Sequence, residues 1–179
     1  MKKLLVLGLG VATFAAVPSR VTAQANNNTT IPFVVVTLFT PGTVAVPVDL
    51  AVAGAVGNEM ERLLRERGNI ISPITGVAIP VDVARVAIGM MTTATQADRD
   101  AMAKALSTAG TNDGVVSQLL SNLPSLLSRP TAGQLQNALS AFNGFVNNAN
   151  AAFLVNPPAE FLALHAILLQ VSTAANRPH

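Results

Sequence analysis

The chain has 179 residues, of which 50% are hydrophobic and only 11% are charged. It contains no cysteine, tryptophan or tyrosine. The lack of cysteine excludes disulfide bonds, and it also excludes the bacterial lipid anchor that is attached to a cysteine. Charged residues make up about 25% of a typical domain, so Asn, Gln, Ser and Thr must cover much of this surface. The lack of Trp and Tyr argues against a lectin or a tight-binding receptor.

The first 25 residues have the layout of a secretory signal peptide. Lysines at positions 2 and 3 precede an apolar run of 14 residues, and a small-x-small site ends at Ala25. At about 1.5 Å per residue, a 14-residue helix spans about 21 Å, which is short of a bilayer core of about 30 Å. We therefore expect export to the periplasm or the exterior, with cleavage after Ala25 or, as the second choice, after Ala23. We expect the mature chain not to span a membrane.

Processing changes the net charge of the chain. The precursor has 11 Lys and Arg residues and 9 Asp and Glu residues, and Lys2, Lys3 and Arg20 leave with the signal peptide, so 11 − 3 = 8 positive charges face 9 negative ones. The basic character of the precursor is therefore no evidence for nucleic acid binding, which needs a clustered positive surface. The only dense basic cluster lies between residues 59 and 67, where three glutamates are interleaved with three arginines. It predicts a solvated helix face, with no nucleic acid as a partner.

Residues 31–175 are expected to form one domain. Residues 26–30 read Asn-Asn-Asn-Thr-Thr, a polar leader that is expected to be disordered. Residues 176–179 are expected to fray. The segment Phe33–Phe39 is β-branched and aromatic, which predicts a short buried strand.

An octapeptide occurs twice in the chain, 33 residues apart. Val-Ala-Val-Pro-Val-Asp-Leu-Ala at 44–51 recurs as Val-Ala-Ile-Pro-Val-Asp-Val-Ala at 77–84, with six of eight positions identical. Proline holds the preceding residue extended, and the aspartate two residues later can cap a helix. We therefore expect an extended arm followed by a helix in each copy, capped by Asp49 and by Asp82. One explanation is an internal duplication of residues 40–67 and 72–91, and the other is shared capping chemistry in a chain rich in Ala and Val.

Three helices are predicted in the first half of the domain. The first runs from about Leu50 to Arg67 and ends at a glycine C-cap. The second starts after Asp82 and loses its pattern near Thr92. The third is capped by Thr95, and Asp98 three residues later completes a capping box.

Further helices are predicted in the second half. Val115–Leu123 forms one, and Ser125–Arg129 is expected to be a short apolar helix between two prolines. Thr131 and Gln134 form a second capping box, which opens the clearest amphipathic helix of the chain. The predicted fold class is therefore mainly α, with a single compact domain of about five to seven helices and a short N-terminal extended or β segment.

The last predicted helix, Phe161–Val171, is apolar on nearly every face apart from His165 and Gln170. Such a helix is usually the buried centre of a bundle, or else it forms an oligomer interface. If it forms an interface, the possible interaction face consists of Phe161, Leu164, Ile167, Leu168 and Val171.

No residue pattern predicts a catalytic, cofactor or metal site. The bases that could activate a nucleophile are His165, on an apolar helix, and His179, the last residue given. A metal site is not indicated, because the chain has no cysteine, no second histidine near His165 and no acidic loop with the calcium spacing. We therefore expect no enzyme activity, no catalytic residues and no cofactor.

The leading hypothesis is an exported, non-enzymatic protein with a structural role, which acts by interaction with itself or with another exported protein. The alternative is an extracytoplasmic carrier of a small apolar ligand, held among core side chains of a helical bundle. A hydrolase is the third hypothesis, and the sequence favours it least. The adaptable walls of a carrier would be Met90, Met91, Met102, Phe142, Phe145 and Phe161.

Overall fold

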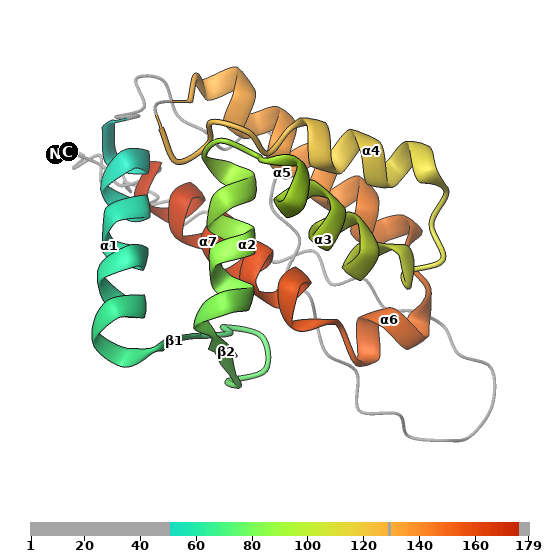
Figure 1. Cartoon of the computed structure of the whole chain (residues 1–179). Helices are drawn as coiled ribbons and strands as arrows, with labels where there is room; N and C mark the ends of the chain where they lie inside the picture. The colour runs from blue at the N-terminus through green and yellow to red at the C-terminus, as the bar shows by residue number, and fades with distance from the viewer. Residues whose placement is uncertain (1–50, 129, 176–179) are drawn as a thin grey trace, which may run out of the picture.

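The structure, a computed structural model, describes residues 51–128 and 130–175 (Figure 1). The expected signal peptide and its cleavage site at Ala25, the polar leader, the strand Phe33–Phe39 and the cap Asp49 lie outside the described residues. So does most of the first octapeptide copy, and so does the predicted frayed tail.

The described chain is mostly helical, as the sequence predicts. It has seven helices and one two-stranded sheet. The helices are α1 (Ala51–Arg67), α2 (Val81–Met91), α3 (Gln96–Ser107), α4 (Asp113–Ser121), α5 (Ala132–Asn148), α6 (Ala151–Val155) and α7 (Ala159–Ala175). The strands β1 (Asn69–Ile71) and β2 (Ala78–Pro80) form an antiparallel hairpin between α1 and α2, with Ile70 opposite Ile79.

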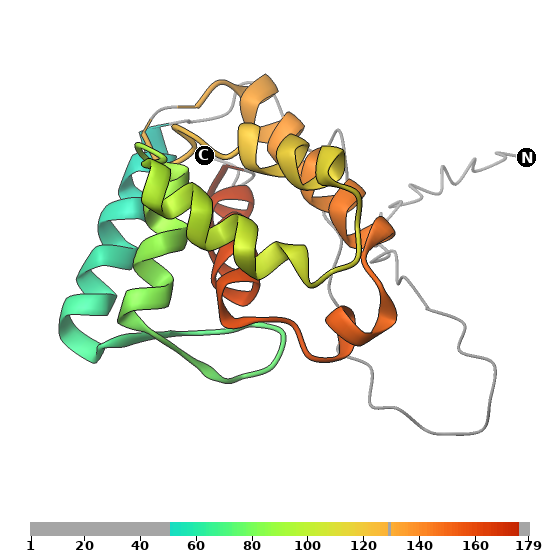
Figure 2. The ribbon, with the colours of Figure 1, turned by 45° about the vertical axis from the view of Figure 1, so that its right-hand side comes forward.

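Helix α7 lies at the centre of the packing. It packs against α1 and α2, and it also contacts α3 (Figures 1 and 2). Helices α2, α3 and α4 each pack against the next helix in the chain, α2 on α3, α3 on α4 and α4 on α5. None of the described helices is both long enough and apolar enough to cross a membrane.

Four phenylalanine rings join the last three helices. Phe161 of α7 stacks on Phe142 of α5 with ring centroids 5.3 Å apart. Its other neighbours are Phe153 of α6, at 5.1 Å in an edge-on contact, and Phe145 of α5, at 5.8 Å. Three of these rings are completely buried and Phe153 is nearly so. Large aromatic groups in offset or edge-on contact are a strong contribution to a core, so this cluster fixes α5 and α6 on α7.

Both predicted capping boxes are confirmed. At α3, the Asp98 N–H donates to Thr95 Oγ1 and the Thr95 N–H donates to Asp98 Oδ2, each at 3.2 Å. At α5, the Gln134 N–H donates to Thr131 Oγ1 at 3.1 Å, and the Thr131 N–H donates to Gln134 Oε1 at 2.7 Å. The predicted end of α1 is confirmed as well, because Gly68 follows Arg67 with a φ of +70°, in the left-handed region that favours glycine.

The predicted cap at Asp82 is wrong. Helix α2 begins at Val81, directly after β2, and its N-cap is Pro80, with no side-chain hydrogen bond to the cap. Asp82 therefore lies inside the first turn, where its exposed carboxylate acts only on the helix dipole. The extended arm before the helix is confirmed in this copy of the octapeptide, since Ala78–Pro80 forms β2.

The short helix predicted from Ser125 is absent, and residues 125–128 form turns instead. Ser125 has a φ of +68°, which no α-helix allows. Its N–H donates to the Thr92 carbonyl at 3.2 Å, and the Leu127 N–H donates to the Met91 carbonyl at 2.9 Å. The segment thus supplies donors to carbonyls at the end of α2 that have no helical partner, which explains why it does not close a helix of its own.

Candidate interaction groove between α1 and α7

Helices α1 and α7 pack side by side in opposite directions. The start of α1 meets the end of α7, where Ala55 and Ala174 line one hollow. The end of α1 meets the middle of α7, where Leu63 and Ala166 line another. Side chains four residues apart lie on one face of a helix, and Val56, Met60 and Leu64 form such a buried stripe on α1.

The two hollows form one groove on the surface. The larger has a volume of about 230 Å³ and the smaller of about 210 Å³. Met60 and Gln170 line both hollows, so the hollows adjoin each other along the same side of α7. We call this surface the α1–α7 groove. Its remaining lining residues are Ala55, Val56, Glu59, Leu63, Arg67, Asn69, Ile70, Ile71, Pro73, Ala166, Leu169, Thr173 and Ala174.

Small side chains on α7 leave this space open. Ala166, Gln170 and Ala174 follow one another at intervals of four residues, so they lie along one stripe of the helix. The two alanines do not extend far enough to fill the gap toward α1. Gln170, exposed between them, separates the two hollows. Leu169 is half-buried beside this stripe and gives the larger hollow an apolar wall.

The larger hollow ends at the outer edge of β1. Three consecutive residues of this strand, Asn69 to Ile71, line it, although successive strand side chains point to opposite faces. A hollow that contacts all three therefore lies along the strand's edge, and no residue of β2 lines it. In an antiparallel pair of strands, hydrogen-bonded and non-hydrogen-bonded residue pairs alternate. The Ser72 N–H donates to the Val77 carbonyl at 2.9 Å, so these two residues form a hydrogen-bonded pair. Ile71 and Asn69 therefore fall in non-hydrogen-bonded pairs, and their N–H and C=O groups point away from β2.

Within the described residues the sheet has only two strands, so β1 has no second strand partner there. Ile71 is 56% exposed at the mouth of the larger hollow. The large apolar side chain of Ile71 is therefore exposed next to an apolar hollow, on a strand whose outer edge has no partner strand among the described residues. Val77 is equally exposed, at 58%, on the same hairpin, but it does not line either hollow.

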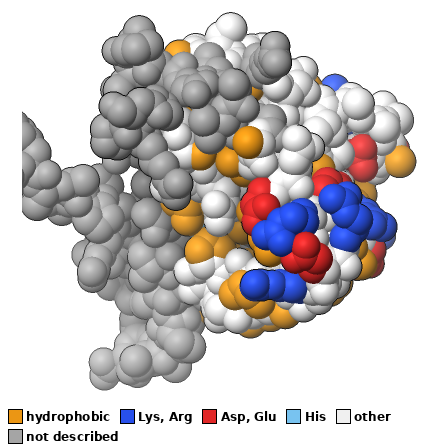
Figure 3. Space-filling model, turned by 90° about the vertical axis from the view of Figure 1, so that its left-hand side faces the viewer, with side chains coloured by type: hydrophobic (Ala, Val, Ile, Leu, Met, Phe, Trp, Pro, Cys, Tyr) orange, Lys and Arg blue, Asp and Glu red, His pale blue; other side chains and the backbone are white. Residues whose placement is uncertain are grey.

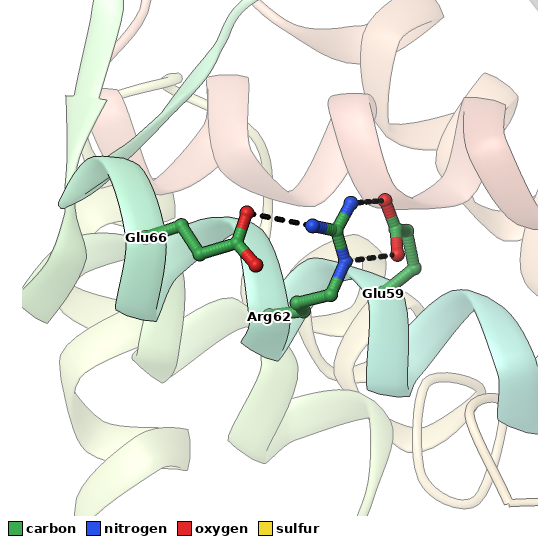
Figure 4. Close-up of polar contacts among 3 residues, drawn as sticks. All are labelled: Glu59, Arg62 and Glu66. Atoms are coloured by element: carbon green, nitrogen blue, oxygen red, sulfur yellow. Dashed lines mark hydrogen bonds and ion pairs between the residues drawn. The ribbon is translucent and has the colours of Figure 1, made fainter.

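The charged residues next to the groove compensate one another. Arg62 donates to both oxygens of Glu59, at 2.6 and 2.8 Å, and to Glu66 at 2.6 Å (Figure 4). The hydrogen bond from Arg62 lowers the pKa of the Glu59 carboxyl, and the two glutamates raise the pKa of the Arg62 guanidinium. Figure 3 shows basic and acidic side chains gathered in one cluster on this face, with hydrophobic side chains around it.

The five residues of the interaction face predicted on α7 do not line the groove. Phe161, Leu164, Ile167, Leu168 and Val171 are all completely buried inside the folded monomer. The sequence left two interpretations of this helix, the buried centre of a bundle and an oligomer interface. The burial of these five residues supports the first. Sequence reasoning missed the groove side of α7 because a helix that is apolar all round has no period to mark its exposed face. Gln170, with alanines four residues on either side, was the available signal.

The six predicted walls of a ligand carrier are core residues. Met90, Met91, Met102, Phe142, Phe145 and Phe161 are completely buried, and none of them lines either hollow. His165 is also buried, with its ring 5.6 Å from that of Phe142. Among residues 51–128 and 130–175, no three His, Cys, Asp or Glu side chains are grouped so that they could hold a metal ion.

The chain matches no protein-family model, and searches of curated proteins and of solved structures found no match. Among the described residues, the α1–α7 groove is the surface feature with the best-defined lining.

Proposed function

We propose that this is an exported protein that acts by protein interaction, and that it binds an apolar segment of a protein chain in the α1–α7 groove. The segment belongs to another copy of this protein or to a second exported protein. Export rests on the layout of residues 1–25. The observation that supports the binding surface is the continuity of an apolar groove with the outer edge of β1 and the exposed Ile71.

The size of the hollows favours protein side chains over a small ligand. Pockets for drug-sized ligands have volumes of about 300–1,000 Å³ and enclose most of the ligand. Each hollow here is smaller, at about 230 and 210 Å³, and opens to the surface. Two adjoining hollows of this size suit two successive anchor side chains of a peptide.

The chemistry of the lining also suits a protein segment. The floor combines apolar side chains of α1, β1 and α7 with the uncharged Gln170, and the charged residues that line it are Glu59 and Arg67. Depletion of charge at the centre and polar residues at the rim are typical of protein interfaces. A peptide strand that pairs with β1 would add main-chain hydrogen bonds to the burial of its side chains, which is the β-augmentation mode of recognition.

Site-specific photo-crosslinking in cells that produce the full chain tests this proposal. A photoreactive side chain at position 71 or 63 should form adducts of discrete mass with a protein, and twice the monomer mass identifies self-association. The matched control is position 77, which is equally exposed on the same hairpin but outside the groove. Leu169→Glu should abolish the adducts from position 71. Equal adducts from position 77, or adducts that persist in Leu169→Glu, would contradict the proposal.

A further inference from the structure

We propose that the first occupant of the α1–α7 groove is the segment Phe33–Phe39 of the same chain, so that another protein must displace this segment to bind. This inference rests on the proposed function of the groove. It starts from the sequence of the segment, Phe-Val-Val-Val-Thr-Leu-Phe, which is uncharged, β-branched and aromatic. A segment of this kind forms strands that are stable only when one side is buried against an apolar surface.

The groove offers both contacts that such a strand needs. The outer edge of β1 presents the N–H and C=O groups of Asn69 and Ile71 for pairing. The larger hollow beside it presents apolar walls for alternate side chains of the added strand. The charges also agree, because the only charged residue between Ile31 and Leu50 is Asp49.

The chain length allows this segment to reach the whole groove. The described structure begins at Ala51, four residues before the groove residue Ala55. Residues 40–50 form a connector of 11 residues, which can extend to about 36 Å at about 3.3 Å per residue. Helix α1 has 17 residues and is therefore about 26 Å long.

The length of the segment also fits. Seven residues in a strand extend over about 23 Å. Strand β1 has three residues and is therefore about 10 Å long. It runs across the end of α1 (Figure 1), so the segment is long enough to pair with all of β1 and to place alternate side chains in the larger hollow.

Attachment to the same chain favours this occupant over a free one. A short flexible connector holds a tethered segment at an effective concentration of the order of millimolar. A second copy of the protein at micromolar concentration competes poorly with such a segment. The tethered segment therefore occupies the groove in isolated molecules, and assembly begins when an incoming segment replaces it.

Thiol cross-linking tests this inference directly, because the chain has no cysteine of its own. Processed protein carrying Val36→Cys and Ile71→Cys is treated at low micromolar concentration with a short bis-maleimide. The matched control pairs Val36→Cys with Ser117→Cys, an exposed position on α4. We expect the Val36–Ile71 pair to give a cross-linked monomer in several-fold higher yield than the control pair, independent of protein concentration.

The outcomes separate this inference from the proposed function. Monomer cross-links at the control level, with photo-adducts from position 71 retained, would overturn the intramolecular occupant and leave the interaction groove standing. Cross-links found only in dimers, with a yield that rises with concentration, would assign the segment to a second copy and likewise overturn it. Cross-linked monomer without any photo-adduct would support the inference and refute the proposed function. Val36→Ser with Ile71→Cys must give no cross-link.

Discussion

The carboxylate of Asp98 lies directly against the backbone of Gly89. A Cβ atom built on Gly89 would be 2.6 Å from Asp98 Oδ2, which is closer than any normal contact. The carboxylate cannot move away freely, because it accepts hydrogen bonds from the Thr95 hydroxyl at 2.6 Å and from the Thr95 N–H at 3.2 Å. The close contact of α2 with the start of α3 therefore depends on a glycine inside a helix.

This contact predicts that Gly89→Ala destabilises the protein. Alanine normally stabilises a helix interior relative to glycine, by about 1 kcal/mol. Here the added methyl group must displace the Asp98 carboxylate from its capping box, so we expect a net loss of about 1 kcal/mol in urea titration. The matched control is Gly144→Ala in α5, where nothing lies within 4 Å of the new Cβ and stability should rise. In an Asp98→Ala background, Gly89→Ala should become stabilising.

The caps predict a second difference, between Thr95 and Asp82. Thr95→Ala removes a side chain that accepts the Asp98 N–H, and it should lower the free energy of unfolding by about 1 kcal/mol. Asp82→Ala removes only a favourable charge from the first turn of α2, which is worth about 0.3–1 kcal/mol at an exposed site. Denaturant titration of both variants measures the two losses in the free energy of unfolding and shows whether they differ. A loss for Asp82→Ala that clearly exceeds about 1 kcal/mol would restore the capping role that the structure denies to Asp82.

Local chemistry made much of this fold readable. Both capping boxes, the glycine end of α1 and the amphipathic α5 follow from residues within one turn of each other, and the structure confirms them. The missed elements depend on partners that lie more than one helical turn away in the sequence. The hairpin is held by pairing of β1 with β2, and residues 125–128 are fixed by the carbonyls of α2. A single sequence does not reveal such partners.

The groove lay beyond sequence reasoning for a similar reason. Its lining comes from α1 and β1, which are neighbours in the sequence, and from α7, which begins 88 residues after β1 ends (159 − 71 = 88) and meets them only in the folded chain. Each segment contributes residues that are unremarkable alone, such as Ala166 and Leu63. The exposed side of α7 was hidden because its hydrophobic residues cover nearly the whole circumference, so burial had to be learned from the neighbours of the helix.

The ion pair on α1 predicts a pH dependence. The pKa of Glu59 is lowered from its ordinary value of 4.5, first by the hydrogen bond from Arg62. The sign follows from this direction: the stabilisation is fully present above the unfolded pKa and is lost as the pH falls through the lowered folded value. Arg62→Gln should raise the pKa of Glu59, as measured by NMR titration of the carboxyl group. Because both side chains are about half exposed, the effect on stability at neutral pH should be small.

The last prediction separates the core of α7 from its groove side. Leu168 is completely buried, whereas the next residue, Leu169, is half-buried and lines the larger hollow. An unpaired ion in a dry interior costs several kcal/mol, and a domain is typically stable by only about 5–15 kcal/mol. Leu168→Lys should therefore unfold the monomer or greatly lower its stability, as should Leu164→Lys, which is also completely buried.

Leu169→Lys should behave differently, because its long side chain can place the ammonium group in water at the mouth of the groove. We expect this variant to keep the far-UV circular dichroism and the cooperative unfolding of the parent, while the photo-adducts from position 71 disappear. Gln170→Lys, at an exposed position between the hollows, controls for added charge on the same helix. If Leu169→Lys unfolded as Leu168→Lys does, Leu169 would belong to the core and the α1–α7 groove would lose its apolar wall as a binding surface.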